Sequence, residues 1–188
     1  MSEIFTYIME SLFSVLSGFY TFAIILGWRA AKHFNKQENS RKIIRYAKFS
    51  RSAVITIKWL FRKEGEKAFD DLTYMIALTA FTLQDYPCFL KNITKLKTMD
   101  SQKKFWLALY YITVCRDIIT AETYYGSLLA SPNNLSYEGS MLLQGVLYCE
   151  EGDFKKAENV LQQIFPHLEM IASRRIATVY LMKCENVE

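Results

Sequence analysis

Glycine and proline are scarce in this chain, with seven and three residues among 188. A sandwich or barrel of many short strands needs more turn-forming residues than that, so the composition argues against an all-β fold. Hydrophobic residues make up 51% of the chain and charged residues only 22%, which excludes an intrinsically disordered protein. The sequence therefore predicts an all-α fold.

Residues that carry catalysis or bind metals are also few. Histidine occurs only at His33 and His167, and the four cysteines are spaced 27, 34 and 35 residues apart. Each cysteine lies in an apolar run, which favours buried thiols in a reducing compartment over disulfides. The pairs Asp70–Asp71 and Glu150–Glu151 are interpreted as solvated turns or helix ends rather than catalytic dyads. With no nucleotide-binding, nucleophile-elbow or zincin motif, we expect no enzyme activity, catalytic residue, metal, cofactor or small-molecule substrate.

Charged residues are absent from a run of eighteen residues, Ser11 to Trp28. As a helix this run would be about 27 Å long, close to the thickness of the hydrocarbon core of a bilayer. We therefore predict a transmembrane helix over about 7–28, within an N-terminal segment 1–28. No Lys or Arg precedes the run, which argues against a cleaved signal peptide. The alternative is a buried core helix at the start of a helical stack.

Positive charge is concentrated directly after this run. Residues 29–63 hold eleven Lys/Arg against one Glu, whereas 1–28 have a net charge of −2 and 64–188 of −4. Basic residues that flank a span stay on the cytoplasmic side, so we predict a single-pass protein with its N-terminus outside and its body in the cytoplasm.

The segment 29–65 is predicted to be a basic juxtamembrane helical region, because it carries an apolar stripe at helical spacing. Its cations suit anionic lipid headgroups, and a solvated face of a packed helix is the alternative. The positive charge is confined to one segment beside the predicted span, which argues against nucleic-acid binding. The predicted headgroup contacts are Arg41, Lys42, Arg45, Lys48 and Arg51.

A repeat of helical pairs follows, and its last copy is the clearest. In MLLQGVLYCEEGDFKKAENVLQQIFP the key residues are Gly145, Tyr148, Gly152, Asp153, Phe154, Ala157 and Leu161. Their spacing resembles that of a tetratricopeptide repeat. We expect Gly145 to let the paired helices approach closely with Tyr148 beside it, and Gly152 and Asp153 to form the turn. Ala157 is predicted to be the small residue where the second helix crosses the first.

Two weaker copies lie upstream, over 74–93 and 106–125. Phe89, Ala121 and Ala157 keep the register across the three copies, at spacings of 32 and 36 residues. Residues 170–183 read as a closing helix. We therefore predict a tetratricopeptide-like domain over 66–188 with a C-terminal capping helix, so that the whole fold is a transmembrane helix followed by a solenoid of α-α hairpins.

The resemblance implies a groove lined by the first helix of each pair. Because this groove would be apolar and aromatic, the implied partner is an amphipathic helix or a hydrophobic peptide. The alternative is that these side chains form the core. The implied groove residues are Tyr74, Leu78, Phe81, Trp106, Tyr110, Thr113, Leu142, Val146 and Cys149.

Together these features predict a membrane-anchored adaptor or scaffold that recruits a protein partner at the cytoplasmic face of a membrane. One alternative is a structural subunit of a larger membrane complex, since Ser14, Ser17, Gly18 and Thr21 would let another helix approach closely. Another is a soluble helical regulator whose first helix belongs to the core.

Overall fold

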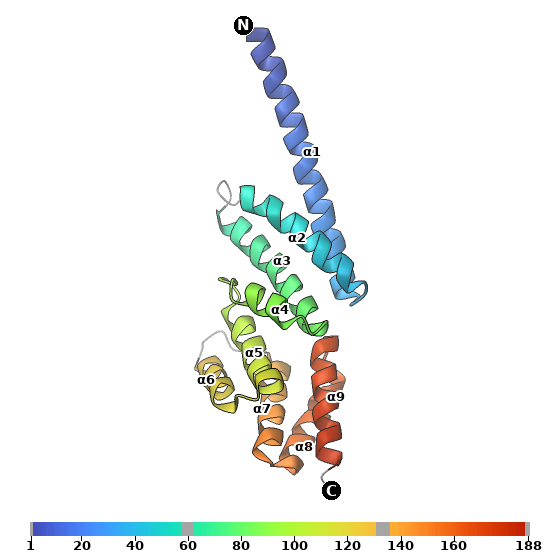
Figure 1. The fold of residues 1–188 in the computed structure, drawn as a ribbon, viewed down its shortest axis with the longest axis vertical. Coiled ribbons are helices and arrows are strands. Elements are labelled where there is room, and N and C mark those ends of the chain that lie inside the picture. The colour runs from blue at the N-terminus through green and yellow to red at the C-terminus, as the bar shows by residue number, and fades with distance from the viewer. Residues whose placement is uncertain (1, 58–61, 131–135, 187–188) are drawn as a thin grey trace. The chain divides into compact units, whose positions relative to one another are not determined.

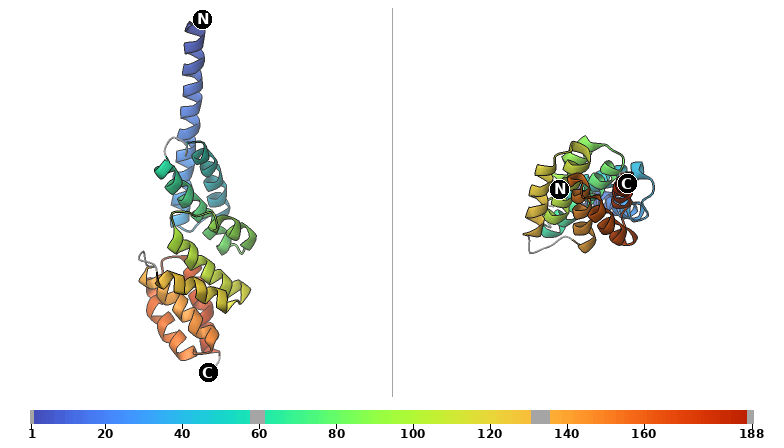
Figure 2. Two further views of the ribbon diagram at one scale, coloured as in Figure 1. Left: turned by 90° about the vertical axis from the view of Figure 1, so that its left-hand side faces the viewer. Right: turned by 90° about the horizontal axis from the view of Figure 1, so that it is seen from below.

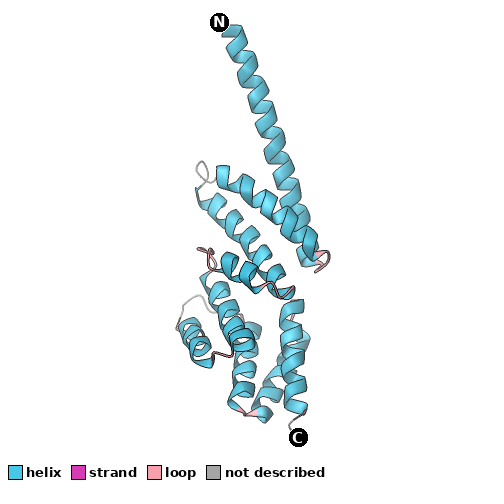
Figure 3. Cartoon of the chain, in the orientation of Figure 1, coloured by secondary structure: helices cyan, strands magenta, loops and turns pink. Residues whose placement is uncertain are grey.

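The structure is entirely helical where it is described. The computed structural model describes the backbone of residues 2–57, 62–130 and 136–186 and, within these ranges, the side chains from residue 16 onward except at residue 57. Every regular element in these ranges is a helix and none is a strand, which confirms the predicted all-α class (Figure 3). The chain divides into two compact units, residues 1–98 and 99–188.

The first unit contains the helices α1 (Ser2–Asn35), α2 (Ser40–Ile57), α3 (Arg62–Thr82) and α4 (Tyr86–Ile93). Each helix packs against the next one along the chain, and α1 also touches α3 (Figure 1). The predicted boundary at residue 28 falls inside α1, which continues without a break to Asn35. The α3–α4 pair, which corresponds to one of the two weaker predicted copies, lies in the same unit as α1 and α2.

Small residues allow α1 and α2 to pack closely. Ala30 and Ala47 are fully buried, and they form one apolar cluster with Leu72 and Ile76 of α3. At Gly27 an added Cβ would lie 2.7 Å from the Oγ of Ser50, so a larger residue there would require the Ser50 side chain to move. The C-terminal half of α1 is therefore part of the core of this unit.

The N-terminal half of α1 extends beyond α2. The helix has 34 residues, which corresponds to a length of about 50 Å. Past the C-terminal end of α2, α1 continues with no described helix packed beside it, as two perpendicular views show (Figures 1 and 2). Around Gly18, where close approach of another helix is predicted, nothing lies within 4 Å of an added Cβ.

The described part of the second unit contains two helical pairs and a closing helix. The elements are α5 (Asp100–Tyr110), a π-helical turn η1 (Tyr111–Cys115), α6 (Ile118–Leu129), α7 (Tyr137–Glu151), α8 (Phe154–Ile164), a 3-10 turn η2 (Phe165–His167) and α9 (Ile171–Glu185). α5 pairs with α6 and α7 pairs with α8, while α9 packs against both α7 and α8. The predicted closing helix is thus present, and it covers the last pair.

One turn design connects the two helices of each predicted repeat. The first helix ends at a residue with a left-handed backbone, whose φ is 60°, 59° or 88°. The next residue is an aspartate whose carboxylate accepts a hydrogen bond from the backbone N–H three positions on, and so caps the second helix. The three turns are Gln84–Asp85, Arg116–Asp117 and Gly152–Asp153.

Two packing roles predicted for the last repeat are confirmed, the close approach at Gly145 and the turn at Gly152. A Cβ added at Gly145 would lie 2.7 Å from both Cγ and Cδ2 of Leu161, which shows how closely α7 and α8 approach at this point. Ala157 on α8 is fully buried. Gly152 has the positive φ that ends α7, as predicted for the Gly-Asp turn.

Candidate functional site

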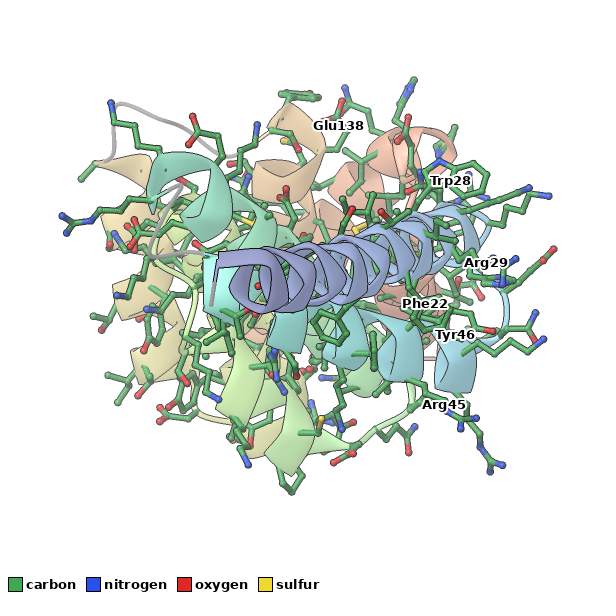
Figure 4. All side chains as sticks on the ribbon, turned by 90° about the horizontal axis from the view of Figure 1, so that it is seen from above. Phe22, Trp28, Arg29, Arg45, Tyr46 and Glu138 are labelled. Carbon is green, nitrogen blue, oxygen red and sulfur yellow. The ribbon has the colours of Figure 1, made fainter. Side chains whose placement is uncertain are left out.

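Large apolar side chains are exposed along the C-terminal half of α1. Ile24 is 70% exposed, Trp28 64% and Phe22 52%. Seen down the helix, Phe22 and Trp28 lie on different sides of α1, with Arg29 nearby (Figure 4). We refer to the full set as the α1 apolar surface: Leu16, Phe19, Phe22, Ile24, Ile25 and Trp28.

Helical geometry explains why these residues remain uncovered. Successive residues of an α-helix are about 100° apart, so Ala23, Leu26 and Ala30 share one face of α1. All three are buried, at the side where α2 packs. Ile24, Ile25 and Trp28 lie on the opposite side, which no described helix of the first unit covers. In this part of α1, one face belongs to the core and the other carries exposed apolar side chains.

The α1 apolar surface continues onto α2 through aromatic contacts. The ring of Phe49 lies 5.8 Å from that of Phe19 and 5.6 Å from that of Phe22, centroid to centroid. Phe49 itself is 38% exposed, and Ile55 further along α2 is 55% exposed. Sequence reasoning missed both residues. An available signal was Phe49 on the otherwise polar side of an amphipathic helix.

Exposed cations lie on α2 and near the C-terminal end of α1. Arg41, Lys42, Arg45 and Lys48 are all exposed on α2. Arg41, Arg45 and Lys48 follow the i, i+4, i+7 spacing of one helix face, and Arg45 points outward in Figure 4. On α1, the Nζ of Lys32 lies 5.4 Å from the centroid of the exposed Trp28 ring.

Arg51, the fifth predicted headgroup contact, is held differently from the other four. Its Nη1 donates a hydrogen bond to Oδ1 of Asn92 at 2.6 Å, with Oγ1 of Thr73 at 3.4 Å. The guanidinium also lies 5.6 Å from the ring of Phe69, and burial lowers the pKa of Arg51. Its charge is therefore directed toward α3 and α4, and we leave it out of the lipid-facing set.

The residues of the predicted groove are mostly buried within their own units. Leu78, Trp106, Leu142, Val146 and Cys149 are at most 1% exposed. Phe81 is 9% exposed, and Tyr74, Tyr110 and Thr113 are half-buried. This burial agrees with the alternative in which these side chains form the core. Their role in binding a partner stays a prediction, and Tyr110 is better placed than Trp106 to fulfil it.

Asp70 was predicted to be solvated, and that prediction is wrong. The residue lies within α3 and is only 2% exposed. Its Oδ2 accepts hydrogen bonds from the backbone N–H of Lys97 and Thr98, at 2.8 and 2.5 Å, and from the Thr98 hydroxyl at 2.7 Å. These donors come from the segment that follows α4, so the carboxylate fixes the end of the first unit.

Glu150 is likewise not a solvated helix end. Its side chain is 12% exposed. Its Oε1 accepts hydrogen bonds from Nη1 of Arg116 at 2.8 Å, the hydroxyl of Tyr180 at 2.8 Å and Nζ of Lys183 at 3.0 Å. Burial alone would raise the pKa of Glu150, but the hydrogen bonds from Lys183 and Tyr180 and the nearby positive charges lower it below its ordinary value. The carboxylate is therefore a structural link between α7, α9 and the turn before α6.

Within the described part of the chain, no helix is long and apolar enough to cross a membrane. The predicted span over 7–28 gains no support from this finding, and its residues 7–15 lie outside the described side chains. Among the described residues no three or more His, Cys, Asp or Glu side chains are grouped to hold a metal ion.

Comparisons with protein-family models, with curated proteins and with solved structures find no match to this chain. The structure itself defines an all-α protein built from helical hairpins, with an exposed apolar surface on its first helix.

Proposed function

We propose that this protein is a membrane-anchored adaptor. The first helix attaches it to a bilayer as a single-pass anchor with its N-terminus outside, and the exposed cations of α2 contact anionic headgroups on the cytoplasmic face. The helical hairpins then recruit a protein partner, an amphipathic helix or a hydrophobic peptide.

The observation that carries the proposal is the α1 apolar surface. Leaving Ile24 and Trp28 more than half exposed, at 70% and 64%, is unfavourable in water, and large exposed apolar patches mark sites of interaction. Lipid would cover all sides of the helix that α2 does not. Arg41, Arg45 and Lys48 supply the adjacent positive charge, which is worth about 1 kcal/mol per cation near an anionic membrane.

Vesicle flotation of the full chain tests this attachment. We expect the protein to float with vesicles of phosphatidylcholine and phosphatidylserine. Replacing Ile24 and Trp28 together by Glu removes two exposed apolar side chains that lipid would bury, so binding should fall at least tenfold. Ile119→Glu is the matched control, because Ile119 is 79% exposed on α6 and should not alter flotation. Equal flotation of the double variant, or none of the original chain, would refute attachment through α1.

Carbonate extraction tests the mode of attachment. A transmembrane helix stays in the membrane pellet at alkaline pH, whereas a helix lying on the surface is released. We expect the chain in the pellet. Recovery in the wash, from membranes that bind the chain at neutral pH, would replace the single-pass anchor by a peripheral one.

Recruitment of a partner is tested at Tyr110. This residue is half-buried at the end of α5, so a photo-crosslinking amino acid can replace it with less disturbance than at the buried Trp106. We expect crosslinks to an added amphipathic helical peptide that a scrambled peptide of equal composition does not give. Equal crosslinking of both peptides would contradict specific binding of an amphipathic helix in the predicted groove.

A second candidate function is a helical regulator whose first helix is core. It is favoured by the burial of Ala23, Leu26 and Ala30 against α2. Under this candidate, deletion of residues 1–28 unfolds the first unit, and the original chain does not float with vesicles. Circular dichroism of the deletion variant together with the flotation assay distinguishes the two candidates.

A further inference from the structure

Two cysteines of the second unit lie side by side although they are 35 residues apart. The Sγ of Cys184 on α9 is 3.7 Å from the Sγ of Cys149 on α7. Both are free thiols and both are buried, at 2% and 1% exposure. The other two cysteines differ from this pair, since Cys88 lies in the first unit and Cys115 is exposed.

Contacts of α9 with α7 hold the pair together. Ala177, Tyr180 and Cys184 are buried at the i, i+3, i+7 spacing of one helix face. The hydroxyl of Tyr180 and the ammonium of Lys183 both donate to Oε1 of Glu150, the residue next to Cys149. α9 is therefore locked in the register that places Cys184 opposite Cys149.

We propose that Cys149 and Cys184 form a modification site, a dithiol that hydroperoxides oxidise to an intramolecular disulfide joining the closing helix to α7. A disulfide needs its sulfurs about 2.05 Å apart, so the thiols must approach by less than 2 Å. Rotation about the cysteine side-chain bonds with a small shift of α9 can supply this movement. Disulfides of proteins in reducing compartments are typically of this reversible kind.

The reaction begins at Cys184. This residue lies in the last turn of α9, and helix ends open more readily than helix centres. Burial raises the pKa of the Cys149 thiol to about 12, which makes Cys149 the poorer first nucleophile. The slow step is therefore the opening that exposes the thiol of Cys184.

The chemistry balances with hydrogen peroxide as the oxidant. The Cys184 thiolate attacks one peroxide oxygen, the O–O bond breaks, and the departing hydroxide takes up the thiol proton as water. Cys149 then attacks the sulfenic sulfur, the S–S bond forms, the S–O bond breaks, and the Cys149 proton leaves in a second water. Two thiols lose two electrons and two protons, and one peroxide is reduced to two waters.

Peptide mapping of the full chain tests the proposal directly. The reduced protein is freed of reductant, treated with hydrogen peroxide, alkylated after unfolding and digested without reduction. We expect a peptide pair linked through Cys149 and Cys184 in the monomer, which dithiothreitol separates. The midpoint of thermal unfolding should rise by about 5 to 10 °C on oxidation, because the link constrains the unfolded chain.

Two variants separate this site from the other thiols. Cys88→Ser/Cys115→Ser retains the pair, and it should give the same linked peptides and the same rise in unfolding temperature. In Cys184→Ser, Cys149 should remain alkylatable after the same treatment. The proposal is overturned if both thiols of the original chain stay free while Cys115 is oxidised, or if both advance separately to sulfinic acids. This mapping does not depend on membrane attachment.

Discussion

Gly145 marks the closest approach of α7 and α8, and replacing it tests how tightly this pair is packed. In Gly145→Ala the new methyl group would lie 2.7 Å from two atoms of Leu161, which is fully buried and cannot move aside freely. Overpacking of this kind costs about 1 to 3 kcal/mol, and the higher helix propensity of alanine offsets up to about 1 kcal/mol. We expect a net loss of about 1 to 2 kcal/mol in the free energy of unfolding, measured by urea denaturation.

Gly126→Ala is the control for this variant. Gly126 is a helical glycine of the same unit, and nothing lies within 4 Å of an added Cβ. Only the propensity gain applies there, so this variant should be more stable than the original chain by about 0.5 to 1 kcal/mol. Equal effects at the two glycines would show that the α7–α8 contact is not as close as the structure has it.

Glu150 should make the stability of the second unit depend on pH. Its pKa is lowered in the folded chain, so its stabilising effect is complete above its unfolded pKa of about 4.3 and is lost as the pH falls through the folded value. Glu150→Gln keeps an oxygen acceptor but loses the charge. Since Arg116 and Lys183 are partly exposed, we expect a loss of only about 1 kcal/mol at pH 7.

The measurement is the free energy of unfolding of both proteins from pH 7 to pH 3. The difference between them should begin to shrink as the pH falls below the unfolded pKa of Glu150, and it should disappear below the lowered folded pKa, where the original carboxylate is neutral in both states. Glu151→Gln, at the exposed neighbouring position, should follow the original chain over the whole range. A constant difference between Glu150→Gln and the original chain would mean that charge at this position does not contribute.

At the level of the elements, the hairpin turn is the feature that the three repeats share, and Asp85 tests it. Its carboxylate accepts from the backbone N–H of Cys88 at 3.1 Å and caps α4, a helix of only eight residues. Asp85→Ala should lower the free energy of unfolding by about 1 kcal/mol, whereas Asp85→Asn should stay close to the original value because asparagine is as good an N-cap. Chemical denaturation measures both, and equal losses would contradict the capping role.

The sequence predicted these hairpins because their turn chemistry is local. Gly152 and Asp153 identify their own turn, and Asp85 and Asp117 could be aligned to it by register. The π-helical turn η1 could not be anticipated. It inserts one residue, so that the N–H of Asp117 bonds to the carbonyl of Tyr111 six positions back, whereas Asp153 bonds to Tyr148 five positions back. Nothing in the local composition distinguishes this turn from an ordinary helix end.

The candidate site was predictable only in part, because burial depends on distant partners. The apolar character of α1 and the four exposed cations of α2 follow from composition and spacing. Which face of α1 stays exposed depends on α2, whose Ser50 meets Gly27. Arg51 carries the same charge as its neighbours, yet Asn92, 41 residues away, determines where it points. Such long-range pairings have no signature in a single sequence.

At the scale of the whole molecule, the features that carry the two proposals lie in different units. The first unit contains the α1 apolar surface and the exposed cations, which carry the proposed membrane attachment. The second contains the clearest repeat, the closing helix and the thiol pair. The network around Glu150 and the contact between Gly145 and Leu161 both lie wholly inside the second unit. These contacts of the second unit therefore do not need residues of the first unit.

We accordingly predict that residues 99–188 fold on their own. Such a fragment has its own buried core and a closing helix over its last pair, and its length exceeds the size below which a helical core usually needs extra links. It should show a helical circular dichroism spectrum and one cooperative thermal transition. Gly145→Ala should destabilise the fragment by the same amount as the full chain, since both partners of that contact are retained. A fragment that melts without a transition, or in which this substitution has no effect, would show that the second unit depends on the first for its packing.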